Sequence, residues 1–263
     1  MGSENVIRHS DIISMTADLF KEKFGYEIEG VWFPRVTSIT SPLQKKWWGM
    51  RRAAEWGTLI HETVEDMLRG ENVSPDAKCA VAIETFLRWQ SEYPMRIADP
   101  VNDIEKRVWD PEYGYAGTVD IIAEVEGVRG IIDVKTSTAV VKEHYLQTAA
   151  YLYAYNKTSG TNRPCQTRWI LRIDQYQECR GCLAKLRIKY GSQSINGGKS
   201  ANWRICNHQW GAAKGEIEFQ ELKGYERDLA LFFDLKERWE WANKEWLARI
   251  PNYEKNIRQH ALL

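Results

Sequence analysis

The sequence predicts an α/β protein in which helices flank both faces of a mixed central β-sheet. Strand-like alternation of hydrophobic and polar residues runs through two neighbouring segments, 114–125 and 131–136, and helical patterns precede and follow them. Hydrophobic residues make up 43% and charged residues 27% of the 263 residues, values typical of a globular protein. A chain of this length is expected to form one large domain, or one domain with an insertion.

The segments Gly114–Asp120 and Ile131–Thr136 are predicted to pair as a β-hairpin, because a glycine-rich connection joins them. Side chains two residues apart leave the same face of a strand, so Asp133 and Lys135 should point the same way, roughly 7 Å apart along the chain. Asp120 brings a second carboxylate from the neighbouring strand. The hairpin therefore places two acids and a lysine together.

Two carboxylates beside an ammonium group suit a hard divalent cation, because magnesium and manganese prefer oxygen ligands. We expect Asp120 and Asp133 to hold Mg²⁺ or Mn²⁺, and Lys135 to orient or deprotonate a water molecule. Such a site would hydrolyse a phosphodiester. The alternative is that Asp133 and Lys135 form an ordinary surface ion pair, which would contribute about 0–1 kcal/mol.

The segment Ala53–Leu68 has a strong helical pattern of hydrophobic residues, and a second stripe runs beside it. Gly57, His61 and Glu65 lie four residues apart and so share one face. The glycine permits the close approach of another backbone, while the histidine and the glutamate project beside it. We interpret Glu65 as a residue that supports the site or pairs with a charge at the surface.

The segment Val141–Tyr155, which follows the hairpin, is also predicted to be helical. Gln147 and Tyr151 lie four residues apart on it and share a face. Their amide and hydroxyl groups can hydrogen-bond phosphate oxygens or bases, although an ordinary amphipathic helix would show the same pattern.

The ordered set of these motifs resembles the RecB-like branch of the PD-(D/E)xK nucleases. The set lies between about Pro34 and Tyr155 and comprises Gly57-x-x-x-His61, Gly114-Tyr-Ala-Gly-Thr-Val-Asp120, Ile131-Ile-Asp-Val-Lys-Thr136 and Gln147-x-x-x-Tyr151. That branch includes the RecB nuclease domain, the CRISPR-adaptation nucleases and the mitochondrial genome-maintenance exonuclease. The resemblance implies a restriction-endonuclease-like fold and a metal-dependent exonuclease that degrades DNA from its ends.

The resemblance also implies roles for individual residues and partners. His61 and the backbone carbonyl of Val134 would join Asp120 and Asp133 as metal ligands, and the Gln–Tyr pair would position DNA. A preference for single strands, a role in DNA repair or recombination, and a recombination or replication protein as partner belong to the same expectation. An endonuclease of the same fold is the closest alternative. A non-catalytic nucleic-acid-binding protein is another, but the intact Asp, Asp and Lys set argues against it.

DNA binding would depend on local basic clusters, because the formal net charge of the chain is +0 and provides no steering field. One cluster is interleaved with two tryptophans that could stack on bases, and it comprises Lys45, Lys46, Arg51 and Arg52. A second lies in 179–215, which contains no Asp or Glu, and its expected DNA contacts are Arg187, Lys189 and Lys199. In the alternative interpretation, the tryptophans belong to the core and these basic residues are solvated or balance acids elsewhere.

The same segment contains cysteine and histidine residues at spacings that occur in metal sites. Four soft ligands could close a tetrahedral structural zinc site, namely Cys179, Cys182, Cys206 and His208, although the two pairs are farther apart than in a usual zinc finger. Some RecB-like relatives hold an iron–sulfur cluster instead. No such cluster is expected here, because no cysteine precedes His61, although Cys165 and the three other cysteines would supply four thiolates. A zinc-stabilised interaction protein with incidental hairpin acids is therefore a rival to the enzyme.

The whole chain, 1–263, is expected to form one nuclease domain. Its parts are a helical N-terminal part (1–100), a catalytic sheet core (101–175), a basic cysteine-containing insertion (176–215) and a C-terminal helix (216–263). Further elements are expected as helices at Asp11–Lys23, Pro75–Glu92 and Tyr225–Ile250, strands at Ile104–Trp109 and Arg168–Ile173, and a loop or short strand at Phe33–Ser41.

Targeting signals are not evident in the sequence. No apolar stretch is long enough to span a bilayer, and the N-terminus lacks the basic-then-apolar pattern of a signal peptide. The five cysteines, an odd number, argue against a disulfide framework and fit a reducing compartment. We expect a soluble intracellular protein without a membrane partner, in the cytoplasm or in a host cell if the protein is viral.

Overall fold

A computed structural model of the chain describes residues 15–41, 50–158, 162–198 and 203–253. The helices are α2 (Ala17–Phe24), α3 (Val36–Thr40), α4 (Met50–Leu68), α5 (Ala80–Glu92), α6 (Lys142–Thr158), α7 (Tyr225–Ala242) and α8 (Lys244–Leu247), with a short 3-10 turn at Trp203–Ile205. The strands are β1 (Gly25–Ile28), β2 (Val31–Pro34), β3 (Met95–Arg96), β4 (Ile104–Asp110), β5 (Tyr115–Val125), β6 (Val128–Lys135), β7 (Thr167–Cys179), β8 (Lys185–Lys189), β9 (Ser192–Asn196) and β10 (Trp210–Glu221).

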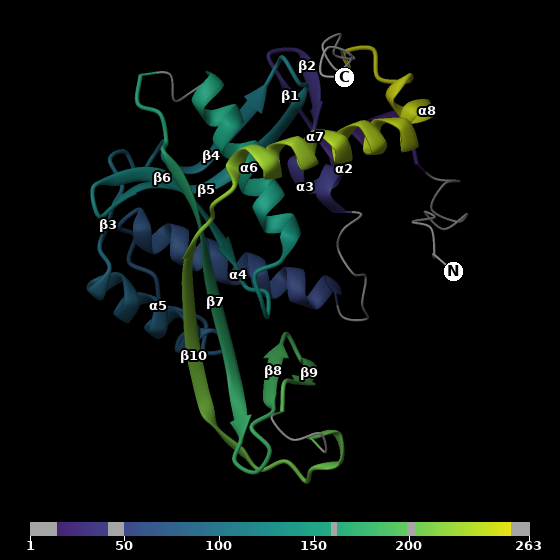
Figure 1. The fold of residues 1–263 in the computed structure, drawn as a ribbon. Coiled ribbons are helices and arrows are strands. Elements are labelled where there is room, and N and C mark those ends of the chain that lie inside the picture. The colour runs from purple at the N-terminus through teal and green to yellow at the C-terminus, as the bar shows by residue number, and fades with distance from the viewer. Residues whose placement is uncertain (1–14, 42–49, 159–161, 199–202, 254–263) are drawn as a thin grey trace.

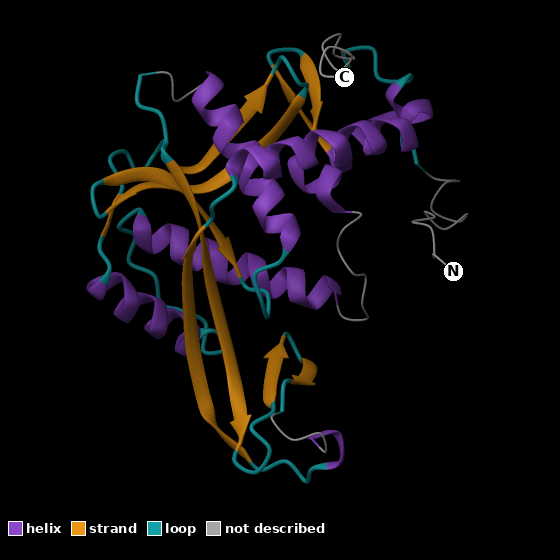
Figure 2. Cartoon of the chain, in the orientation of Figure 1, coloured by secondary structure: helices purple, strands orange, loops and turns teal. Residues whose placement is uncertain are grey.

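A mixed β-sheet forms the centre of the molecule (Figure 1 and Figure 2). β5 pairs antiparallel with β4, β3 and β6, and β6 pairs parallel with β7. Helix α6 makes the connection between the two parallel strands, as parallel pairing requires. The predicted α/β class, with a mixed central sheet flanked by helices, is thus confirmed.

Two hydrophobic clusters cover the two faces of the sheet. Ile131 packs in the cluster that contains α6 and α7, whereas its neighbour Ile132 packs in the cluster that contains α4 and α5. Consecutive residues of a strand point to opposite faces, so a strand buried on both sides must be hydrophobic at both positions. This explains why 131–134 of the sequence is nearly continuous in hydrophobic residues around Asp133.

The predicted hairpin is formed by β5 and β6, and its turn is tighter than expected. Glu126 and Gly127 connect the strands with φ angles of 52° and 81°. Two consecutive residues with positive φ form the kind of two-residue turn that matches the twist of a hairpin. Pairing therefore continues to Val125 and Val128, three residues before the predicted start of the second strand at Ile131.

Strands β7 and β10 form a long antiparallel arm that extends away from the helices, as Figure 1 shows. The pairing runs from Trp169–Glu221 to Cys179–Trp210, with an irregularity between Trp210 and Ala213. The short β8–β9 hairpin lies at the far end of the arm and folds back beside it. The sequence predicted only the first part of β7, and it placed no strand at β10.

Several predicted element boundaries were wrong for local reasons. Thr16 caps α2 by accepting a hydrogen bond from the backbone of Leu19 at 3.2 Å, so this helix begins at Ala17, whereas the predicted caps Ser10 and Asp11 lie outside the described residues. Helix α5 starts later than predicted, because Asp76 closes a turn with the backbone of Lys78. The segment Phe33–Ser41, expected as a loop or short strand, contains the end of β2 but also helix α3, and the expected C-terminal helix is divided at Asn243 into α7 and α8.

No helix in the described ranges combines the length and the apolar character needed to cross a bilayer.

Gly117 on β5 tests how tightly α6 packs on the sheet. A Cβ atom at this position would lie 2.3 Å from Cε1 of Tyr151, so Gly117→Ala should destabilise the fold by about 1–3 kcal/mol through overpacking. Urea denaturation would measure this loss. Gly211→Ala is the control, because the nearest atom to its Cβ would be Glu178 O at an ordinary 3.4 Å.

A double-mutant cycle identifies the ring as the cause. In a Tyr151→Leu background the cost of Gly117→Ala should fall, since the aromatic ring no longer occupies that space. Strictly additive effects would contradict this packing explanation.

Candidate functional site

Asp120 and Asp133 converge where the pairing of β5 and β6 ends. The last register pair at this end is Ile121 with Ile132, and beyond it Asp120 Oδ2 accepts a hydrogen bond of 2.7 Å from the backbone N–H of Val134. Asp120 and Asp133 are both buried. The two carboxylates predicted to share a site are thus brought together by the hairpin.

Lys135 lies beside Asp133, as the period of the strand predicts. Its Nζ is 2.5 Å from Asp133 Oδ2, and the side chain of Lys135 is 21% exposed against 4% for Asp133. The Lys135 ammonium is therefore a close partner of this buried carboxylate. A buried pair with one side open to solvent is unlike the surface ion pair of the alternative interpretation.

Helix α4 delivers His61 to the same place. His61 Nδ1 lies 3.7 Å from Asp120 Oδ2 and 4.0 Å from Glu65 Oε1. The helix can approach the end of β6 because Gly57 faces Thr136, whose Oγ1 would be only 3.3 Å from a Cβ at that position. The four-residue stripe of the sequence analysis therefore corresponds to a contact between α4 and the acidic strands.

Glu65 and Glu105 complete the acidic group, where the sequence predicted only a supporting or surface role for Glu65 and no role for Glu105. Burial, followed by the Glu105 and Asp120 carboxylates, raises the pKa of Glu65 to about 8. Burial and Asp120 likewise raise the pKa of Glu105, whose φ of 54° marks a local irregularity in β4. The four-residue spacing from His61 could have placed Glu65 in the site. Glu105 comes close to the other acids only through tertiary packing.

Burial and neighbouring charges shift the pKa values of the ionisable side chains in this site. Burial raises the pKa of Asp133 to about 6, Asp120 adds to this and Lys135 opposes it. Burial alone would lower the pKa of Lys135, but Asp133 and Asp120 raise it above its ordinary value, so the amine stays protonated. Burial, and then the charge of Lys135, lower the pKa of His61, which favours the neutral imidazole that binds metals.

Gln147 and Tyr151 of α6 are both buried. Gln147 Nε2 donates to Thr40 Oγ1 at 2.9 Å. Burial, and then Asp133 and Asp120, raise the pKa of Tyr151 well above its ordinary value. Tyr151 thus lies near the two aspartates, whereas the observed partner of Gln147 is the Thr40 hydroxyl.

The basic residues expected to contact DNA differ in their placement. Arg187 is 3% exposed, and its guanidinium contacts Asp174 through Nε at 2.9 Å and Nη2 at 2.7 Å. Lys189 Nζ donates to the backbone oxygen of Thr136, and burial lowers its pKa to about 8. Arg52 is exposed. The remaining members, Lys45, Lys46, Lys199 and the side chain of Arg51, lie outside the described residues.

Other cations of the acid-free segment also pair with acids outside it. Lys185 contacts Glu216 at 2.7 Å, and Lys214 contacts Glu178 at 3.0 Å. Together with Arg187, these pairs match the alternative that charges of the segment balance acids elsewhere. Arg187 would have to leave Asp174 in order to contact a phosphate, and its predicted contact with DNA stays a prediction.

The four predicted soft ligands meet at the far end of the arm. The ligand atoms of Cys179, Cys182, Cys206 and His208 all lie within 4.8 Å of one another, so this cluster could bind a metal ion. It is the one such group of His, Cys, Asp and Glu found among the described residues. The ligand atoms of the acids around Asp120 are therefore farther apart from one another than those of this cluster.

Comparison of the chain with protein-family models and with curated proteins found no match.

The chemistry of the acidic group fits a hard divalent cation. The donors are carboxylate oxygens and an imidazole. A bound cation would offset the burial and the mutual repulsion that raise the pKa values of Glu65, Glu105 and Asp133.

Proposed function

We propose that the protein is a metal-dependent deoxyribonuclease with a restriction-endonuclease-like fold, which hydrolyses phosphodiester bonds from DNA ends. The observation that carries the proposal is the convergence of Asp120, Asp133 and Lys135 with His61 of α4 in one buried acidic group. The ordered motifs that resemble RecB-like nucleases supply the substrate class. His61 and Lys135 are 74 positions apart in the chain, but they lie in the same group in space.

Magnesium or manganese is the cofactor that we propose. Asp120, Asp133, His61 and the carbonyl of Val134 would hold it, because these are hard oxygen ligands with one imidazole. When bound, such an ion polarises a phosphoryl oxygen and offsets the charge that develops during displacement. The thiol-rich cluster on the arm would select a softer ion such as zinc and takes no part in this chemistry.

The protein's own residues would position the reacting groups. The backbone N–H of Val134 fixes Asp120, and Lys135 is held beside Asp133 with its ammonium partly exposed. A protonated lysine donates hydrogen bonds, so Lys135 would orient the attacking water or stabilise charge on the phosphate. In this form it would act as a donor and not as the base.

Gln147 and Tyr151 would act on DNA indirectly. Both are buried, and Gln147 would hold Thr40 in place while Tyr151 would support the two aspartates. Direct contact with DNA would fall to exposed cations such as Arg52 of α4.

The function can be tested with end-labelled linear and circular DNA, each single- and double-stranded, incubated with Mg²⁺ or Mn²⁺. We expect linear substrates to be degraded to short products, circular substrates to survive, and EDTA to stop the reaction. Cleavage of circular DNA would replace the exonuclease by the endonuclease alternative. If every substrate remains intact with both ions, the proposal is wrong.

A further inference from the structure

The cysteine–histidine cluster has the dimensions of a site for a single tetrahedral ion. Cys179 Sγ lies 3.9 Å from Cys206 Sγ, and Cys182 Sγ lies 3.4 Å from His208 Nδ1. Zinc bonds of roughly 2.3 Å to sulfur and 2.0–2.1 Å to nitrogen in a tetrahedron place two sulfurs roughly 3.8 Å apart, and sulfur and nitrogen roughly 3.5 Å apart. Both observed distances match edges of that tetrahedron.

The same distances disfavour other uses of the four side chains. A disulfide needs its sulfurs roughly 2.0 Å apart, and all five cysteines of the chain are free. A cluster of several iron and sulfide ions would have to fit among ligand atoms that lie within 4.8 Å of one another, which leaves room for one ion. Cys165, the further thiol that such a cluster would use, precedes β7, whereas Cys179 ends it.

The backbone around Cys179 is shaped to support a thiolate. The backbone N–H groups of Cys182, Gly181 and Gln209 are directed at the Cys179 sulfur. A thiolate is the form of cysteine that binds metal. The turn is closed by the backbone of Leu183, which has a φ of 61° and donates to Cys179 O at 3.0 Å.

The end of the arm has little else to hold it together. The buried part of its hydrophobic cluster consists of three small residues, Cys179, Cys182 and Ala184, and two of these are cysteines of the proposed site. Two tryptophans and Cys206 are partly buried against them. His208 stacks on Trp210 with ring centroids 4.5 Å apart. Small structures without a sufficient core depend on cross-links or metals for their folding.

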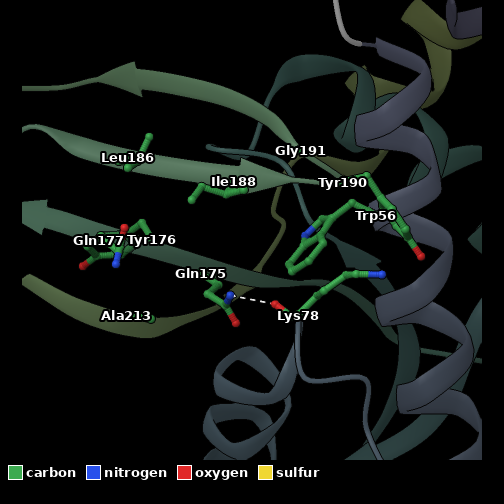
Figure 3. Close-up of a pocket in the computed structure, with 10 residues that line it drawn as sticks. All are labelled: Trp56, Lys78, Gln175, Tyr176, Gln177, Leu186, Ile188, Tyr190, Gly191 and Ala213. Carbon is green, nitrogen blue, oxygen red and sulfur yellow. Dashed lines mark hydrogen bonds between the residues drawn. The ribbon is translucent and has the colours of Figure 1, made fainter. Parts of the chain in front are cut away.

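The β8–β9 hairpin follows this end of the arm and pairs with β7 next to Cys179, at Glu178–Lys185 and Gln177–Leu186. A cavity of about 390 Å³ lies between the hairpin, the arm and α4, lined by Trp56, Gln175, Tyr190 and others (Figure 3). The hairpin contacts the central part of the protein at two places. Lys189 Nζ donates to the backbone oxygen of Thr136, and the ring centroid of Tyr190 lies 5.1 Å from Lys78 Nζ. Thr136 follows the lysine of the acidic group, so the cluster and that group are connected through the hairpin.

We propose that Cys179, Cys182, Cys206 and His208 bind one zinc ion, which closes the end of the arm and holds the β8–β9 hairpin against the end of β6. The zinc site does not depend on the proposed nuclease function, because it is inferred from ligand geometry at the opposite end of the arm. It does give the hairpin a fixed place beside the acidic group.

Metal analysis of the purified full-length protein tests the site. Inductively coupled plasma mass spectrometry should find one zinc and no stoichiometric iron per chain. Cys182→Ser and His208→Ala should each lose the zinc, while Cys79→Ser should retain it, since Cys79 is a buried free cysteine outside the cluster. Equal zinc in Cys182→Ser and the unchanged protein would overturn the site, as would iron with sulfide or a protein that takes up no zinc.

Chelation of the unchanged protein tests the role of the ion without relying on a variant that folds. Removal of zinc should speed amide hydrogen exchange in β8–β9 and increase proteolysis between Cys182 and Cys206, with recovery after Zn²⁺ but not Mg²⁺ is added. Unchanged exchange after zinc removal would overturn the structural role. A zinc-loaded protein that leaves DNA intact would contradict only the nuclease proposal. A protein that cleaves DNA but binds no zinc would contradict only the zinc proposal.

Discussion

Asp133→Asn is expected to lower the rate of DNA cleavage by about a thousandfold or more. The substitution keeps the shape of the side chain but removes a buried negative charge from the acidic group, where it pairs with Lys135 and lies beside Asp120. Loss of one group that stabilises a transition state typically costs about 10²–10³ in rate, and loss of a metal ligand should cost at least as much. Initial rates on labelled linear DNA would measure it, and Lys135→Ala should show a loss of similar size.

Glu124→Gln is the matched control for this prediction. Glu124 lies on β5, four residues after Asp120, but its carboxylate pairs with Arg96 at 2.7 Å and Arg163 at 3.7 Å. This variant should cleave DNA like the unchanged protein. Asp133→Asn should still bind single-stranded DNA, since removing an acid weakens repulsion from phosphates. If Asp133→Asn cleaves DNA as fast as Glu124→Gln, the assigned role of the carboxylate is wrong.

Arg187→Met is expected to destabilise the β8–β9 hairpin by about 3 kcal/mol. Asp174 and Arg187 are both buried, and removing one partner of a buried ion pair typically costs about 3–5 kcal/mol. The lower end applies because Arg172 still pairs with Asp174 at 3.2 Å. Amide exchange in β8–β9 should therefore become about a hundredfold faster, while exchange in β5–β6 stays unchanged.

Lys214→Met separates this role from DNA binding. Lys214 pairs with Glu178 at an exposed position of the same arm, and surface pairs contribute little to stability. Its removal should leave β8–β9 exchange unchanged. If Arg187 instead grips a phosphate, Arg187→Met would weaken DNA binding and reduce its salt dependence without altering exchange. That result would contradict the structural role.

The hairpin and its acids could be predicted because their signals are local. Alternation fixes which side chains share a face, and Asp133 and Lys135 are two residues apart on one strand. The stripe of Gly57 and His61 is equally local, since four residues make about one helical turn. What alternation alone could not supply is the bond from Asp120 to the Val134 backbone, which depends on where strand pairing ends.

The missed features depend on partners far away in the sequence. Glu105 meets Glu65 only after β4 packs near α4, 40 positions apart in the chain. Arg187 was assigned to DNA because its segment has no acid, but Asp174 lies on the strand before that segment. The outer half of the arm escaped prediction because its strands pair with each other away from the hydrophobic core and carry charged and polar residues.

Titration of manganese into the protein, followed by electron paramagnetic resonance, tests most directly whether the acids form a centre for a hard metal. The unchanged protein and Glu124→Gln should bind Mn²⁺ equally. Asp120→Asn and Asp133→Asn should each weaken binding at least about tenfold, because loss of even a supporting partner of a metal ligand costs about 10–100-fold. Equal Mn²⁺ affinity in all four proteins, or no binding by the unchanged protein, would contradict the account.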